Sequence, residues 1–197
     1  MEIPNLGVVK EQIKAYHDSG LYDKEIKAVT DSAKQYLEEN LARYQGQKAA
    51  IVFDIDETTL SNWPIILAQD FAFVYNERQA WVAKAEAPAI QGSLELYRLA
   101  RDKGLAIIFL TGRGDSERTL TALNLKRAGY TTFTELIMMS PEQEKKLEVG
   151  EFKRLERKRL TAQGYRILIN IGDQASDLAG GYAEATFKLP NPMYYVP

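Results

Sequence analysis

The sequence predicts an α/β fold: a doubly wound, Rossmann-like parallel sheet with helices on both faces. Three short apolar runs, 49–55, 105–110 and 167–172, lack the alternation that is typical of half-exposed strands. Segments with helical periodicity separate these runs. A repeated strand–helix–strand order favours right-handed βαβ units in one parallel sheet. The 197 residues are enough for one domain of this kind.

Weaker patterns complete this predicted core. Two further apolar runs, 135–139 and 185–189, are candidate strands. Apolar residues recur at helical spacing in three segments, each followed by a glycine: 91–103, 115–128 and 151–163. Glycine directly after a periodic segment is a common end of a helix. The order of these elements is that of a doubly wound sheet.

Two segments do not belong to this alternation. Residues 1–47 have helical periodicity, and residues 61–90 are rich in aromatic side chains. We expect the two segments to form a small helical cap or lobe on the α/β core, which comprises 48–60 and 91–197. The whole chain, 1–197, is thereby predicted to be a single domain.

Composition excludes several kinds of chemistry. The chain has no cysteine and one histidine, His17, so thiol nucleophiles, zinc–thiolate sites and multi-histidine metal sites are excluded. A formal net charge of −2 gives no basic surface for a nucleic acid polymer. No apolar stretch approaches the ~20 residues of a membrane span. Carboxylates, lysines, hydroxyls and the backbone must therefore supply the chemistry.

Polar residues follow the three strongest strand candidates. Asp54 and Asp56 come after residues 51–53 of the first, Thr111 follows the second, and Asp173 and Asp177 follow the third. A single aspartate at such a place usually forms a turn or caps a helix. Two pairs at one sheet edge would repel one another unless a cation neutralised them. Oxygen ligands alone favour Mg²⁺, so the sequence predicts a magnesium site there.

These segments resemble a known family. The strings FDIDET at 53–58, LTGR at 110–113 and GDQASD at 172–177, with a lysine between the last two, are similar to the ordered motifs of the haloacid dehalogenase (HAD) superfamily. The first and last strings are typical of its subfamily IIIB acid phosphatases. That group includes bacterial class C acid phosphatases and plant vegetative storage proteins. Almost the whole chain takes part in the resemblance, which implies a HAD-type sheet.

The resemblance also implies catalytic roles. Asp54 would be the nucleophile that forms an aspartyl-phosphate, and Asp56 the general acid and base. Thr111, with the neighbouring backbone at Gly112 and with Arg113, would bind the phosphoryl oxygens. A lysine would neutralise charge on the transferring group. Our choice for it is Lys153.

The lysine has rival candidates in the sequence, and the metal ligands are assigned from the resemblance alone. Arg154 and Lys158 are alternatives to Lys153, and most of the basic residues around it are expected to be solvated. For the metal, the resemblance implies Mg²⁺ ligation by the carboxylates of Asp54 and Asp173 and by the backbone carbonyl of Asp56. Asp177 would bind the metal or orient its ligands.

The substrate depends on the cap rather than on the core fold. We expect a small-molecule phosphate monoester. An aryl phosphate or a nucleoside monophosphate would suit aromatic residues of the 61–90 segment, Trp63 among them, together with Tyr194 and Tyr195. Most of the aromatic residues in the segment are expected simply to pack the lobe.

Two other functions compete with an acid phosphatase. One is a storage or binding protein that keeps the fold, as in some plant relatives; the presence of Asp54 argues against it. The other is a phosphorylation-dependent receiver, whose order of motifs differs. Bacterial members are often exported, which suggests an exported or periplasmic protein, although no signal peptide is recognisable in this sequence. The sequence does not indicate an oligomeric state.

Overall fold

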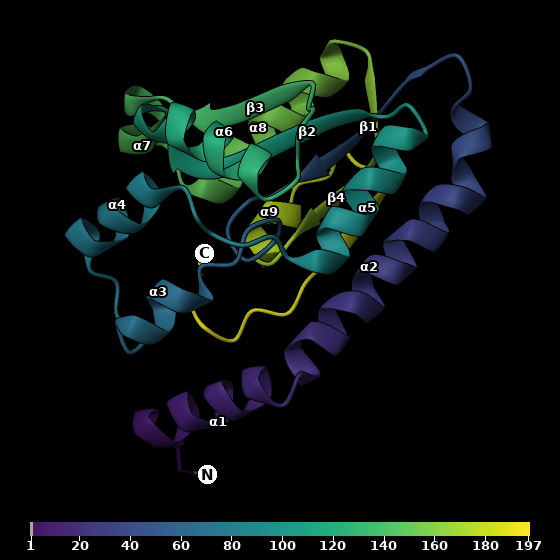
Figure 1. The fold of residues 1–197 in the computed structure, drawn as a ribbon. Coiled ribbons are helices and arrows are strands. Elements are labelled where there is room, and N and C mark those ends of the chain that lie inside the picture. The colour runs from purple at the N-terminus through teal and green to yellow at the C-terminus, as the bar shows by residue number, and fades with distance from the viewer. Residues whose placement is uncertain (1) are drawn as a thin grey trace.

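A computed structural model describes residues 2–197, and its core is a parallel sheet with the strand order β3-β2-β1-β4-β5 (Figure 1). The strands are β1 (Lys48–Phe53), β2 (Ala106–Gly114), β3 (Glu135–Met139), β4 (Tyr165–Gly172) and β5 (Ala185–Lys188). The predicted α/β fold is confirmed, and each predicted apolar run contains a strand. Because β1 lies between β2 and β4, the residues that follow these three strands meet at one edge.

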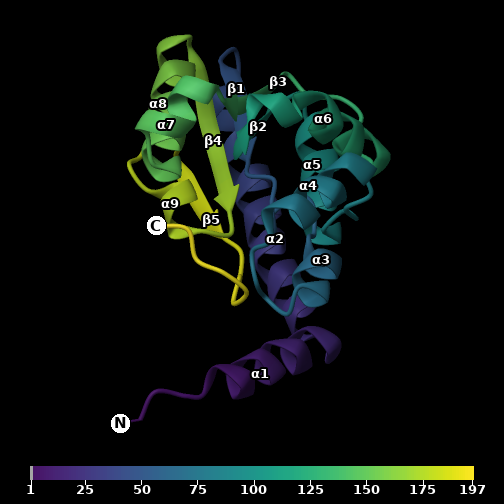
Figure 2. The same cartoon turned by 90° about the vertical axis from the view of Figure 1, so that its left-hand side faces the viewer.

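Helices cover both faces of the sheet (Figure 2). They are α1 (Leu6–Asp18), α2 (Leu21–Asn40), α3 (Trp63–Ala68), α4 (Tyr75–Lys84), α5 (Gln91–Asp102), α6 (Arg118–Arg127), α7 (Pro141–Lys146), α8 (Val149–Ala162) and α9 (Ala175–Leu178), with short 3₁₀ turns at Leu41–Tyr44 and Asp115–Glu117. None of the helices within residues 2–197 is both long and apolar enough to cross a membrane.

Alternate residues of the central strand face opposite helical layers. Ile51 and Phe53 of β1 belong to the larger core, to which α2, α5 and α6 contribute. Ala50 and Val52 belong to the smaller core on the α8 side. All four side chains are essentially inaccessible to solvent. Burial on both faces explains why the strands are continuous apolar runs in the sequence.

The N-terminal 47 residues divide between the core and the periphery. Helix α2 runs along α5, and its Tyr22, Ile26 and Leu37 are buried in the larger core (Figure 1). Helix α1 stands apart and has no buried residue (Figure 2). It contacts the 61–90 insertion, where the Lys10 ammonium lies 2.7 Å from an Asp70 carboxylate oxygen. We therefore assign α2 to the α/β core, and only α1, α3 and α4 to the predicted lobe.

The insertion that carries α3 and α4 is fastened to the core where it ends. The side chain of Asn124, on α6, accepts a hydrogen bond from the Ala87 amide (3.1 Å) and donates one to the Ala87 carbonyl (2.8 Å). Tyr130 donates from its hydroxyl to the Thr59 carbonyl (3.0 Å), close to the start of the insertion. These buried bonds hold both ends of the insertion beside the edge of the sheet where the strand-end aspartates lie.

Candidate active site

The acidic residues predicted at the strand ends meet at one edge of the sheet. Asp54 follows β1, Thr111 lies in the last part of β2, and Asp173 follows β4. All three line a cavity of about 490 Å³. The backbone amide of Asp54 donates to the Ile171 carbonyl at 3.0 Å. Strands β1 and β4 therefore remain paired up to the point where their acidic residues begin.

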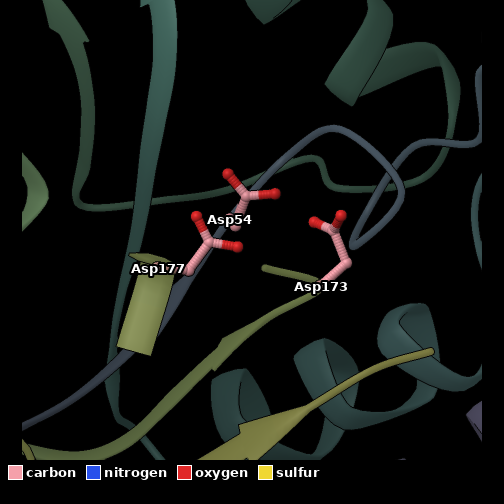
Figure 3. Close-up of side chains that lie close together, drawn as sticks. All are labelled: Asp54, Asp173 and Asp177. Carbon is pink, nitrogen blue, oxygen red and sulfur yellow. The ribbon is translucent and has the colours of Figure 1, made fainter. Parts of the chain in front are cut away.

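Three carboxylates form the centre of this edge. Those of Asp54, Asp173 and Asp177 lie close together, as Figure 3 shows, and one oxygen of each is within 4.8 Å of the others. All three residues are buried. Like charges at such distances repel strongly where water is excluded. The cluster is therefore stable in its ionised form only beside cations.

Lys153, from the start of α8, is the cation that the fold brings to this cluster. Its ammonium donates to Asp54 and, at 2.6 Å, to Asp177. The rival residues lie elsewhere: Arg154 pairs with Glu151 at the surface, and the side chain of Lys158 is exposed. Of the three basic residues considered, Lys153 alone contacts the acidic cluster.

Burial and charge act in opposite directions on this pair. Burial raises the pKa of Asp54, Lys153 lowers it, and the nearby carboxylates of Asp177 and Asp173 raise it; the result lies above the usual range. Burial also disfavours the charged form of Lys153, but Asp54 and Asp177 outweigh this effect and hold its pKa above the usual value. The single ammonium thus stays charged but balances only part of the negative charge around it.

The remaining acid of the cluster, Asp173, is held by neutral donors. Its carboxylate accepts hydrogen bonds from Thr58 (3.0 Å), Gln174 (2.6 Å) and Asn191 (2.7 Å). Burial and the neighbouring Asp177 raise its pKa. Neutral donors orient a carboxylate without removing its charge. The three acids with one lysine therefore leave an excess of negative charge on oxygen ligands, which fits a hard divalent cation.

Asp56 lies apart from this group of three carboxylates. Its carboxylate accepts from the Arg113 guanidinium at 2.6 and 2.9 Å and from the Asn62 amide at 2.8 Å. Burial alone would raise the pKa of Asp56, but Arg113 outweighs burial and holds it well below the usual range. The side chain of Arg113 thus binds Asp56 in this structure, while it also lines the cavity.

Thr111 and Gly112 lie where the pairing of β2 becomes irregular. The register between β2 and β3 shifts between Leu110 and Gly114, so the intervening backbone leaves the regular ladder. The Thr111 hydroxyl accepts a hydrogen bond from the Arg113 amide at 3.1 Å. A Cβ at Gly112 would lie 2.8 Å from a methyl group of Val149. Glycine at this position therefore allows the start of α8 to approach the strand, which brings Lys153 to the site.

The whole chain matches one family model. The model describes subfamily IIIB of the HAD superfamily, the acid phosphatases, and it matches residues 3–197. The chain belongs to this family. The resemblance inferred from its motifs is thereby confirmed, and the chain is placed among the phosphoric monoester hydrolases.

Individual proteins similar to this chain support the assignment. The chain is 37% identical over 194 residues to a stem 28 kDa glycoprotein of Glycine max, and the alignment covers 94% of this chain and 74% of that protein. It is 35% identical over 190 residues to acid phosphatase 1 of Solanum lycopersicum, with the same two coverages. The class C acid phosphatase of Bacillus anthracis has a similar solved structure, with a TM-score of 0.77 and 25% identity; 95% of this chain and 86% of that one are covered. A second structure of that enzyme holds tungstate.

Beside the predicted residues, the site of this phosphatase contains a further buried acid, Glu57, for which the sequence predicts no role. Glu57 accepts hydrogen bonds from Asn62 (3.1 Å) and from the hydroxyl of Tyr194 (2.8 Å). Burial, and then the charge of Asp56, raises the pKa of Glu57 to about 8. Its backbone is left-handed (φ 54°), which is unusual for a glutamate. The FDIDET string contains this glutamate, but nothing in the local sequence indicates its partner 137 residues away.

The cap gives the cavity an apolar wall, but Trp63 is not part of it. The Trp63 ring stacks on His17, with ring centroids 4.0 Å apart and planes 10° apart, so it joins α3 to α1. The substrate-binding role predicted for this tryptophan does not agree with its position. The apolar wall consists instead of Ile65, Ile66, Phe71, Phe73, Trp81 and Val82, and Tyr194 and Tyr195 of the C-terminal segment face the same cavity.

Proposed function

We propose that this protein is a Mg²⁺-dependent acid phosphatase that hydrolyses phosphate monoesters through an aspartyl-phosphate at Asp54. One observation carries the proposal. A buried carboxylate, Asp54, lies at the end of the central strand and is hydrogen-bonded to a buried lysine, Lys153, in a cavity open to small molecules. Membership of the acid phosphatase family agrees with this arrangement.

In the first step, a carboxylate oxygen of Asp54 attacks the phosphorus atom. The new P–O bond forms as the bond to the leaving oxygen breaks, and that oxygen takes a proton from Asp56. In the second step, water attacks the same phosphorus, gives a proton to Asp56, and releases phosphate and the free Asp54 carboxylate. The first step needs Asp56 protonated. Because the Arg113 guanidinium holds the pKa of Asp56 low, Arg113 would have to turn from Asp56 to the phosphoryl group before Asp56 can carry that proton, and mildly acidic pH then favours the protonated form.

The residues around the nucleophile suit a phosphoryl group with developing negative charge. Lys153 stands beside Asp54 and offers its ammonium to the transferring group. Thr111 and the backbone of Gly112 line the same cavity and supply neutral donors. Arg113, whose guanidinium binds Asp56, adds a second cation within reach. Such positioned positive charge is the main source of catalysis in phosphoryl transfer.

The acidic residues would hold the metal. Asp54 and Asp173 would supply carboxylate oxygens, Asp56 its backbone carbonyl, and Asp177 a further carboxylate that also bonds to Lys153. When bound, Mg²⁺ would neutralise charge on the phosphoryl oxygens and lower the repulsion met by the attacking carboxylate.

The substrate class follows from the wall of the cavity. Carboxylates and cations occupy its inner end, whereas Phe71, Phe73 and Tyr195 contribute apolar surface from the cap and the C-terminal segment. An aryl phosphate or a nucleoside monophosphate combines the phosphate and the flat apolar group that these two ends would accept.

Hydrolysis of p-nitrophenyl phosphate tests the proposal. We expect turnover that EDTA abolishes and added Mg²⁺ restores. Asp54→Asn is expected to lower kcat at least about 10³-fold, because the amide lacks the nucleophilic oxygen. Asp102→Asn, an exposed aspartate on α5, is the matched control and should retain full activity. Undiminished turnover by Asp54→Asn would refute the assignment of the nucleophile.

A storage or binding role is the competing function, and activity measurements on a range of phosphate esters distinguish it from an enzyme. A folded, Mg²⁺-loaded sample that hydrolyses none of a set of aryl phosphates, nucleotides and sugar phosphates would favour that role. The intact set of Asp54, Lys153 and Asp173 supports the enzyme instead.

A further inference from the structure

The C-terminal segment, residues 190–197, forms part of the cavity although it contains no helix or strand. Four of its residues line the cavity: Met193, Tyr194, Tyr195 and Val196. The segment is fastened at two points, to α9 and to the loop between β4 and α9. The hydroxyl of Ser176 donates to the Val196 carbonyl at 2.9 Å, and the Val196 amide donates to the Gln174 side chain at 3.1 Å. An irregular segment is thus held across the site by specific hydrogen bonds.

Asn191 connects this segment to the acidic cluster. Its amide nitrogen donates to an Asp173 oxygen at 2.7 Å. Its amide oxygen accepts from the Met193 backbone amide at 2.8 Å. Both ends of the side chain are therefore committed, and the backbone bond forces the NH₂ group to point at Asp173. Asp173 belongs to the group of three carboxylates that fits a divalent cation.

Tyr194 connects the same segment to the other carboxylate pair. Its hydroxyl donates to Glu57 at 2.8 Å. Glu57 accepts from the Asn62 side chain, which in turn donates to Asp56 at 2.8 Å. The Asn62 amide oxygen accepts from the indole N–H of Trp81 at 2.9 Å, so its NH₂ group must face the two carboxylates. An unbroken chain of hydrogen bonds runs from Tyr194 through Glu57 and Asn62 to Asp56.

We propose that Asn191 and Tyr194 are positioning residues of this active site with separate tasks. Asn191 orients Asp173 for the metal, and Tyr194 orients Asp56 for proton transfer through Glu57 and Asn62. The second task rests on the proposed function of Asp56. Partners behind the ligands and the reacting groups matter because small misplacements of a carboxylate lower affinity or rate strongly.

Three variants separate these tasks. Asn191→Leu keeps the branched shape of the side chain but removes both the donor to Asp173 and the acceptor of the Met193 amide, and Tyr194→Phe removes only the hydroxyl. Tyr182→Phe is the control, because Tyr182 is as exposed as Tyr194 (37%) and lies outside the cavity. The measurements are Mg²⁺ affinity of the metal-free proteins by calorimetry, with Mg²⁺ alone as the probe, and kcat and KM for p-nitrophenyl phosphate at saturating Mg²⁺.

The two variants are expected to fail in different ways. Asn191→Leu should weaken Mg²⁺ binding about 10–100-fold and regain nearly full kcat when Mg²⁺ is saturating. Tyr194→Phe should bind Mg²⁺ normally and lose about tenfold in kcat with little change in KM. Tyr182→Phe should match the wild type. The proposal would be overturned if both variants lost Mg²⁺ affinity and kcat to the same extent. It would also be overturned if both variants kept kcat and Mg²⁺ affinity within about twofold of the wild type.

Failure of the proposed function is distinguishable from failure of this inference. If the wild type hydrolyses no phosphate ester, the calorimetry of Asn191→Leu still decides the role of Asn191. A crystal structure of Tyr194→Phe then decides the other half. Release of the Asn62 amide from Asp56 would support the relay, and an unmoved Asn62 would overturn it.

Discussion

Replacing Lys153 by methionine tests how much of the fold depends on charge balance in the acidic cluster. The side chain is buried, with 3% of the residue exposed, and it binds both Asp54 and Asp177. Methionine keeps the length and removes the charge. Removal of one partner from a buried ion pair costs about 3–5 kcal/mol, because the remaining charge stays in low-dielectric surroundings.

That free energy is large enough to measure by melting. For a domain of this size, each kcal/mol lowers Tm by about 2–4 °C, so a loss of about 6–20 °C is expected in the presence of EDTA. Mg²⁺ would supply positive charge to the same carboxylates. Saturating Mg²⁺ is therefore expected to reduce the difference in Tm between the variant and the wild type by at least half.

Calorimetric melting of the wild type, Lys153→Met and Lys158→Met, each with EDTA and with Mg²⁺, is the assay. Lys158 lies on the same helix with an exposed side chain, so its replacement controls for loss of a lysine and should leave Tm nearly unchanged. Activity of Lys153→Met at saturating Mg²⁺ should fall about 10²–10³-fold. A variant that melts with the wild type in EDTA would refute the charge-balance argument.

Three further predictions follow from individual contacts. Gly112→Ala should lose about 1–3 kcal/mol of stability, because the new Cβ would lie 2.8 Å from a Val149 methyl group, and Val149→Ala in the same chain should restore most of it in denaturant titrations. Arg157→Met should lower the free energy of unfolding by about 1–3 kcal/mol in urea titrations, because the buried guanidinium donates to the backbone carbonyls of Asp177, on α9, and of Ala179 and Gly181, which follow α9. Burial raises the pKa of Glu117, but the Arg78 guanidinium outweighs burial and holds that pKa below its usual value. The ion pair therefore stabilises the fold above about pH 4.5, and this stabilisation is lost as the pH falls through the lowered pKa of Glu117. The difference in Tm between the wild type and Glu117→Gln should be constant near neutral pH and disappear in acid; a difference that grows in acid would contradict this sign.

The central part of the fold was predictable because its signals are local. Burial on both faces makes most of β1, β2, β3 and β4 a continuous apolar run, and the acids predicted for the site follow two of these runs. The parallel order of the strands then brings Asp54, Thr111 and Asp173 to one edge without further information. The family motifs added Lys153, whose position on α8 the structure now explains through the close approach of that helix at Gly112.

Contacts between distant segments were not predictable from local patterns. The bonds of Arg113 to Asp56 and of Tyr194 to Glu57 join residues 57 and 137 positions apart. The resemblance predicts that Arg113 binds substrate, whereas in the structure its guanidinium binds Asp56. The aromatic content of the insertion predicts that Trp63 binds substrate, but composition does not indicate which face of a short helix meets the cavity. Its partner, His17, lies on α1.

The boundary between the lobe and the α/β core also depends on contacts that local patterns do not indicate. Helical periodicity was recognised throughout residues 1–47, but periodicity does not indicate which partner a helix face meets. Tyr22 and Leu37 place α2 in the main core, whereas α1 has no buried residue and meets that core through the partly buried Tyr16.

The central claim is that Asp54 carries the phosphoryl group during turnover. Acid quenching of the enzyme during hydrolysis of p-nitrophenyl phosphate, followed by borohydride reduction, converts an aspartyl-phosphate to homoserine that mass spectrometry locates in the chain. We predict homoserine at position 54 in the wild type, none in a sample without substrate, and none in Asp54→Asn. Turnover without modification at position 54, or with modification at another aspartate, would contradict the account.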